Sequence, residues 1–131
     1  MRTPHPQIAA YMQRCRIPAE RLRADGRLTL SHGERHRMHM VPLPGGRLMF
    51  EARVAALPLE AEARRKKVDG ILRIAGQRMA SHREACVVDR SADAFHLQWV
   101  AGGDLGPVAF DAAVERFFRS VVFWKHAAEQ A

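Results

Sequence analysis

The chain has 131 residues, of which 47% are hydrophobic and 27% charged, a composition typical of a globular protein and not of a disordered one. We expect one domain, residues 1–131, in the cytoplasm, because no apolar run reaches the about 20 residues of a membrane span and the N-terminus lacks the apolar stretch of a signal peptide. A net charge of +7 predicts an anionic partner without distinguishing acidic protein, nucleic acid and lipid.

The first half of the chain predicts a short helix and three strands. Apolar residues recur at helical spacing in Ile8, Tyr11, Met12 and Cys15, and Pro18 ends that helix. Alternating apolar positions, separated by turns that contain glycine, then predict strands at residues 27–30, 35–41 and 48–54. Three strands joined by short turns are typical of an antiparallel meander.

The second half predicts a long helix, two strands and a final helix. The apolar stripe Val68, Ile71, Leu72, Ala75 and Met79 indicates a helix from Leu59 to about Ser81. Strands follow at 85–89 and 94–100, joined by a turn at 90–93, and a Phe-rich helix covers 108 to about 127. The order is helix, three strands, helix, two strands, helix, which predicts an α+β fold with a mainly antiparallel sheet.

The sequence offers little to support catalysis. Among seven histidines the densest group is His32, His36 and His39, but His36 and His39 lie an odd number of residues apart and face opposite sides of a strand. A metal site needs three or four converging ligands, and no nucleophile motif, phosphate-binding loop or zinc motif is present. We therefore expect no catalytic residue, no metal and no cofactor, and a protein that is not an enzyme.

A basic surface is the stronger polar feature. Along the predicted strands, the positions that alternate with the apolar residues include five arginines: Arg27, Arg35, Arg37, Arg47 and Arg53. Surfaces that bind nucleic acid usually interleave exposed aromatic residues with such charges, but Phe50, Phe95 and Trp99 fall on the apolar parity. A basic nucleic-acid-binding or regulatory protein is therefore the alternative interpretation, and binding of another polypeptide the leading one.

The order of elements and several spaced landmarks resemble a known family, the class I chaperones of bacterial type III secretion. The landmarks are a D-G-x-L-x-L strand from Asp25 to Leu30, an alternating G-x-L-x-F-x-A-x-V stretch that is followed by Leu57-Pro58, a V-V-D strand, and the strand Phe95-His96-Leu97-Gln98-Trp99. A long middle helix and the Phe-rich last helix complete the pattern, which covers about residues 5–128.

This resemblance implies a twisted antiparallel five-stranded sheet with three helices, assembled as a homodimer that binds a secreted effector in extended form and keeps it competent for export, without a cofactor. The implied effector-binding groove is lined by Ile8, Tyr11, Met12, Leu28, Leu30, Met38 and Met40. The implied dimer interface contains Val68, Ile71, Leu72, Ala75, Leu97 and Trp99. With a pI near 10.7, the chain is expected to favour an acidic segment of its effector.

Overall fold

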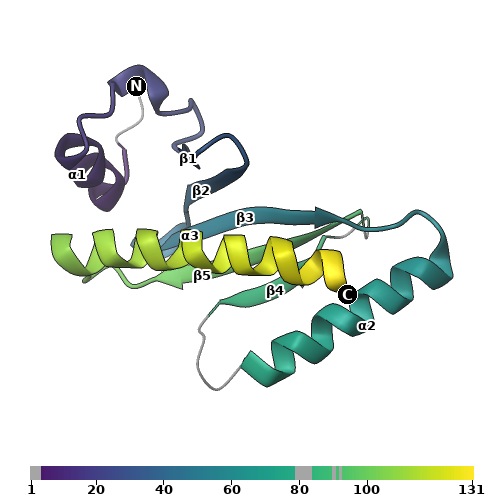
Figure 1. The fold of residues 1–131 in the computed structure, drawn as a ribbon. Coiled ribbons are helices and arrows are strands. Elements are labelled where there is room, and N and C mark those ends of the chain that lie inside the picture. Colours follow the sequence, from purple (N-terminus) through teal and green to yellow (C-terminus); the bar gives the residue numbers. More distant parts are fainter. Residues whose placement is uncertain (1–3, 79–83, 90, 92) are drawn as a thin grey trace.

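The computed structural model describes residues 4–78, 84–89, 91 and 93–131 (Figure 1). In chain order the described elements are α1 (Pro6–Arg14), a 3₁₀ segment (Ala19–Arg21), β1 (Leu28–His32), β2 (His36–Pro42), a 3₁₀ segment (Pro44–Gly46), β3 (Leu48–Ala56), α2 (Ala61–Arg78), β4 (Ala85–Val88), β5 (Ala94–Ala101) and α3 (Pro107–Gln130). The expected α+β fold, with a five-stranded antiparallel sheet and three helices, is confirmed.

Proline and local hydrogen bonds set the limits of α1. The helix begins at Pro6. The fixed φ of proline suits the first turn, and its lack of an N–H costs no hydrogen bond there, because N–H groups of the first turn have no acceptor within the helix. The imidazole Nδ1 of His5 accepts a hydrogen bond from the Gln7 backbone N–H at 3.2 Å and so caps the helix. At the other end Arg16 takes a positive φ of 55°, and Pro18 follows it, so the chain turns away from the helix axis.

The five strands pair in the order β1-β2-β3-β5-β4, with every neighbouring pair antiparallel. The register aligns Leu28 with Met40, Met40 with Phe50, and Phe50 with Trp99. Since facing residues of an antiparallel pair share one side of the sheet, these four side chains form an apolar row across four strands. The alternation seen in the sequence therefore separates one apolar face from one polar face.

Helix α3 lies along the apolar face and closes the core over it (Figure 1). Phe50 is fully buried, and its ring centroid lies 5.2 Å from that of Trp99, 5.6 Å from Phe110 and 5.7 Å from Phe117. These tilted and edge-on arrangements are the favourable ones for aromatic pairs. Helix α2 packs beside α3 and contributes Ile71 to the same core. Phe50 therefore joins the centre of the sheet to α3.

The element limits follow the predicted ones closely, although α2 begins at Ala61 and not at the predicted Leu59. Helix α3 continues to Gln130, beyond the predicted end near residue 127. The two 3₁₀ segments were not predicted, because a single turn is too short to show a period. The predicted end of the middle helix near Ser81, and residues 90 and 92 of the predicted turn, lie outside the described residues.

Replacing Phe50 by alanine should lower the free energy of unfolding by about 3–5 kcal/mol, because it removes a fully buried ring and leaves a cavity beneath α3. Met49 is the control, since it is the neighbouring residue on the opposite face and is half-buried. Met49→Ala should change stability by about 1 kcal/mol or less. Urea unfolding followed by tryptophan fluorescence measures both, and equal losses would contradict the central role of Phe50.

Candidate functional site: the cleft between α1, β1 and α3

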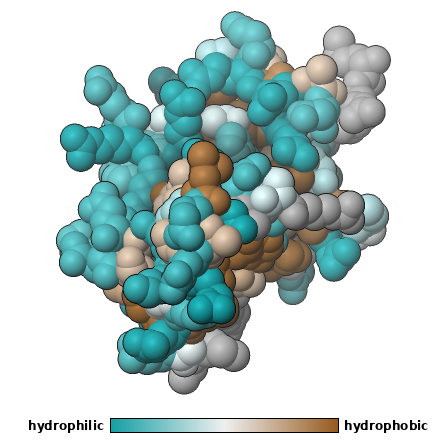
Figure 2. Space-filling model, turned by 90° about the vertical axis from the view of Figure 1, so that its right-hand side faces the viewer, coloured by the Kyte–Doolittle hydropathy of each residue, from teal (hydrophilic) through white to brown (hydrophobic). Residues whose placement is uncertain are grey.

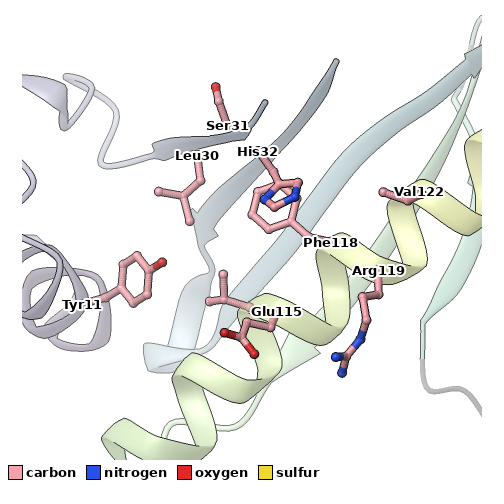
Figure 3. A pocket seen from close by; sticks show the side chains of 9 residues that line it. Tyr11, Leu30, Ser31, His32, Glu115, Phe118, Arg119 and Val122 are labelled. Carbon is pink, nitrogen blue, oxygen red and sulfur yellow. The ribbon is translucent and has the colours of Figure 1, made fainter. Parts of the chain in front are cut away.

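A cleft of about 580 Å³ lies between the N-terminal elements and α3 (Figure 3). Figure 3 shows Tyr11 of α1 and Leu30 of β1 on one side of the cleft and α3 on the other. The nine residues that line it are Tyr11, Leu30, Ser31, His32, Val114, Glu115, Phe118, Arg119 and Val122. The cleft thus combines an apolar interior with a rim of hydroxyl, imidazole, carboxylate and guanidinium groups, which is the usual composition of a site that binds a partly apolar ligand.

The α3 wall of the cleft arises from the helical repeat. Val114, Phe118 and Val122 are spaced by four residues, so they form one stripe along the helix. The adjacent residues Phe117 and Val121 are buried against the sheet. Phe118 and Val122 lie to the side of the residues that contact the sheet. Phe118 is therefore half-buried and Val122 is 43% exposed. The cleft wall is therefore the lateral margin of the same helix face that forms the core.

Polar contacts hold α1 against the rest of the molecule. The Arg14 guanidinium donates to both carboxylate oxygens of Asp111 on α3, at 2.7 and 3.3 Å. The Gln7 amide donates to the Gly102 carbonyl oxygen at 3.2 Å, and the Nε2 of His5 donates to the Gly46 carbonyl oxygen at 2.8 Å. A helix of nine residues is marginal alone in water. These contacts, together with the buried Ile8, keep the α1 wall of the cleft in place.

Tyr11 sits between the helix that carries it and the α3 wall. Its ring centroid lies 5.5 Å from that of Phe110, and the Arg14 guanidinium lies 5.8 Å from the Tyr11 ring centroid. Burial raises the pKa of the Tyr11 phenol, and a hydrogen bond with Cys15 and the negative charge of Asp111 raise it further, while the Arg14 charge opposes them. The phenol is consequently neutral at physiological pH and acts as a polar group at the cleft.

The cleft opens beside an edge of the sheet. Strand β1 is at the end of the strand order and pairs with β2 on one side only, apart from an isolated bridge between Leu22 and Leu28 at its start. Past that bridge, along the part of the chain that the structure describes, no strand covers the outer edge of Thr29–His32. An edge strand offers unpaired N–H and C=O groups to another extended chain.

His32, which lines the cleft, lies beside a second histidine on β2. His32 and His36 are register partners whose ring centroids are 6.5 Å apart, and the His32 ring lies 5.6 Å from the Phe118 ring. Lys125 of α3 donates a hydrogen bond to the Arg35 carbonyl oxygen in the same hairpin turn. Burial lowers the pKa of His36, and the nearby charges of Lys125, His32 and Arg35 lower it further. The β1–β2 hairpin is thereby anchored to α3.

The predicted groove residues divide between this cleft and the core behind it. Tyr11 and Leu30 line the cleft. The other five are buried within the chain: Ile8, Met12, Leu28, Met38 and Met40. Sequence reasoning missed the α3 wall because Phe118 and Val122 adjoin the core residues Phe117 and Val121, and all four read as one broad apolar face. The spacing of Val114, Phe118 and Val122 was the available signal.

The residues predicted for the dimer interface and for the basic surface differ in their exposure. Leu72 is 57% exposed on α2, whereas Ile71 and Leu97 are buried within the chain. Val68, Ala75 and Trp99 are half-buried. All five predicted arginines are exposed: Arg27, Arg35, Arg37, Arg47 and Arg53. Only Arg37 and Arg53 are within strands, both on the polar face, while Arg35 lies in the hairpin turn and the other two precede β1 and β3.

Within the described ranges no group of three or more His, Cys, Asp or Glu side chains converges as metal ligands would. No described helix has both the length and the apolar character that crossing a bilayer requires.

Comparison with known proteins gives a family match over most of the chain. Residues 8–125 match the Tir chaperone protein (CesT) family. No curated protein sequence matches significantly.

Solved structures resemble the fold at low sequence identity. The heterodimeric ExoU–SpcU complex from the type III secretion system of Pseudomonas aeruginosa matches with a TM-score of 0.67 at 15% identity, covering 95% of this chain and 99% of that one. The Yersinia pestis type III secretion chaperone SycH, in complex with a fragment of YscM2, matches with a TM-score of 0.64 at 13% identity, covering 93% and 99%. The ExsC–ExsE complex matches with a TM-score of 0.63 at 18% identity, covering 90% of this chain and 87% of that one.

The phenol of Tyr11 should deprotonate above the ordinary tyrosine pKa of about 10 when the protein is folded. Because the raised pKa belongs to the folded state, its stabilising contribution is complete below pH 10 and is lost as the pH rises beyond it. Tyr11 is the single tyrosine, so tyrosinate absorbance during a pH titration reports it directly. The same titration in denaturant is the control, and equal midpoints would contradict the burial of the ring.

Proposed function

This chain belongs to the Tir chaperone protein (CesT) family of type III secretion chaperones, and we propose that it binds a secreted effector polypeptide in extended form in the cleft between α1, β1 and α3. The observation that carries this proposal is the position of the cleft next to an open strand edge. An extended polypeptide has two needs, partners for its backbone and burial for its apolar side chains, and the site supplies both.

The binding mode follows from strand geometry. A segment that adds to β1 makes main-chain hydrogen bonds along that edge. Its side chains alternate between the two faces of the sheet, so every second one is directed toward the cleft. There Leu30, Phe118 and Val122 offer apolar contact. Such a complex keeps the effector unfolded along this segment, which is the state that export through a narrow channel requires.

The similar structures support a polypeptide ligand. One further match is described as the HopA1–SchA chaperone–effector complex, with a TM-score of 0.64 at 8% identity over 89% of this chain and 88% of that one. The four solved structures named here are protein complexes, and nothing in these comparisons supports the nucleic-acid alternative.

The family consists of non-catalytic chaperones. We extend this to the present chain and propose that it is not an enzyme, needs neither metal nor cofactor, folds as one domain and acts in the bacterial cytoplasm. Holding an effector by strand pairing and apolar contact involves no bond making or breaking.

We further propose a homodimer that uses the outer face of α2. Figure 2 shows a side of the molecule that is mostly hydrophilic but exposes hydrophobic side chains among the polar ones. Leu72 is the exposed member of the predicted interface, and Gly76 follows it at the next turn with no atom within 4 Å of where its Cβ would be. A large apolar residue next to a small one lets a second helix approach closely.

Replacing Val122 by glutamate should weaken binding of the effector at least about tenfold, because it places a charge in the apolar cleft wall. Val108→Glu is the matched control, since Val108 lies on the same helix, is 85% exposed and does not line the cleft. The measurement is affinity capture of the effector after co-expression with each variant. Equal recovery by both variants would show that the cleft is not the binding site.

Replacing Leu72 by glutamate should shift the chain from dimer to monomer, because it brings two like charges into the proposed interface. Leu59→Glu, at a residue that is 89% exposed just before α2, is the control and should remain dimeric. Light scattering at micromolar concentration measures the mass of each variant. A monomeric wild-type protein would refute the dimer.

A further inference from the structure

The polar face of the sheet, opposite α3, concentrates positive charge at its β1–β2–β3 end. The polar-face residues of β1, β2, β3 and β5 include Thr29, Ser31, Arg37, His39, Val41, Met49, Glu51, Arg53, His96, Gln98 and Val100. Arg37 and Arg53 lie two residues beyond the register pair His39 and Glu51, one on each strand. Both arginines are exposed, so their guanidinium groups can contact a ligand.

The pKa of His39 is affected by several of these arginine charges. Its ring is hydrogen-bonded to the Thr29 hydroxyl, with 2.8 Å between Oγ1 and Nδ1. Burial lowers the pKa of His39. Glu51 opposes that change, and the charges of Arg23, Arg27 and Arg37 lower the pKa further. The guanidinium groups of Arg23 and Arg27, which precede β1, and of Arg37 in β2 are therefore all close enough to His39 to influence its charge.

The acidic groups nearby are already engaged. The Glu51 carboxylate accepts a hydrogen bond from the Gln98 amide at 2.6 Å, and Asp25 lies 3.4 Å from Arg27 in an exposed pair. Exposed pairs of this kind contribute little energy and are readily exchanged. A carboxylate supplied by a ligand would consequently meet a positive field at Arg23, Arg37 and Arg53.

We infer that the effector segment which pairs with β1 alternates apolar and acidic residues, with the apolar ones in the cleft and the acidic ones on the side of the sheet that carries Arg37 and Arg53. This inference rests on the proposed function, because it assumes strand addition at β1. Neighbouring positions of an added strand point to opposite faces of the sheet. Leu30 faces the cleft side, whereas Thr29 belongs to the polar face that carries Arg37.

The composition of the polar face favours a polypeptide over a nucleic acid. Binding of single strands usually requires aromatic platforms on which bases stack. The rings of Phe50, Phe95 and Trp99 all pack on the opposite face beneath α3, in contact with one another or with α3. Among the described residues of the polar face there is no Phe, Tyr or Trp. A positively charged surface that has no aromatic rings for base stacking is better suited to bind the carboxylates of an extended polypeptide.

The test uses two fluorescent peptides of equal length with identical apolar residues at alternate positions, one with Glu and Asp between them and one with Gln and Asn. Fluorescence anisotropy should show that the acidic peptide binds the wild-type protein about tenfold more tightly at low salt. The difference should shrink as salt screens the charges. Equal affinities for the two peptides would overturn the inference while leaving the proposed function intact.

Two double variants with the same net charge locate the effect. Arg37→Glu with Arg53→Glu should abolish the preference for the acidic peptide. Arg16→Glu with Arg116→Glu, at exposed residues that lie neither on the polar face nor in the lining of the cleft, should retain it. If the first variant fails to fold, Arg37→Gln with Arg53→Gln replaces it and should reduce the preference. Loss of preference in both charge-matched variants would mean a non-specific field and would overturn the inference.

Two more measurements separate the remaining outcomes. In an NMR titration the pKa of His39 should rise when the acidic peptide binds, because the peptide carboxylates offset the neighbouring guanidinium charges; an unchanged pKa would place the peptide elsewhere and overturn the inference. A single-stranded oligonucleotide that binds more tightly than the acidic peptide at about physiological salt would assign the face to nucleic acid. Failure of both peptides to bind would count against the proposed function itself.

Discussion

The contact of α3 with one face of the sheet is the constraint on which the remaining structure depends. Phe50 is at its centre, with Trp99, Phe110 and Phe117 around it. Because strand residues alternate, burying this face commits every intervening residue to the other face. A single packing choice therefore creates both an apolar core and a polar surface that carries Arg37 and Arg53. A shift of one residue in the register would exchange the two faces, and the core could not form.

The cleft is a by-product of the same contact. A helix is round and a sheet is comparatively flat, so α3 touches the strands along Phe117 and Val121 and diverges from them at Phe118 and Val122. Helix α1 does not fill the diverging space. Its tethers, from Arg14 to Asp111 and from His5 to Gly46, hold it at the far side and leave the space open beside β1. Apolar surface and unpaired backbone thus meet at one place.

Most of the fold could be predicted from the sequence, whereas most of the candidate site could not. Period-two alternation and glycine turns placed the strands within one or two residues, since those signals are local. Exposure depends on how elements assemble. Met38 and Met40 share the alternation of Leu30, yet the first two are buried and the third borders the cleft, because Leu30 lies where α1 and α3 leave the edge strand uncovered. No local pattern distinguishes them.

The way α1 is attached has a kinetic consequence. Its polar contacts all reach loops or α3, and its buried apolar contribution comes from Ile8 and Met12. Losing two such side chains costs about 3–6 kcal/mol, less than unfolding the whole sheet when stability is ordinary. Helix α1 can therefore open in local fluctuations that leave the sheet folded. A ligand held between α1 and α3 can leave through that opening while the sheet stays folded, so residence time and global stability are set by different contacts.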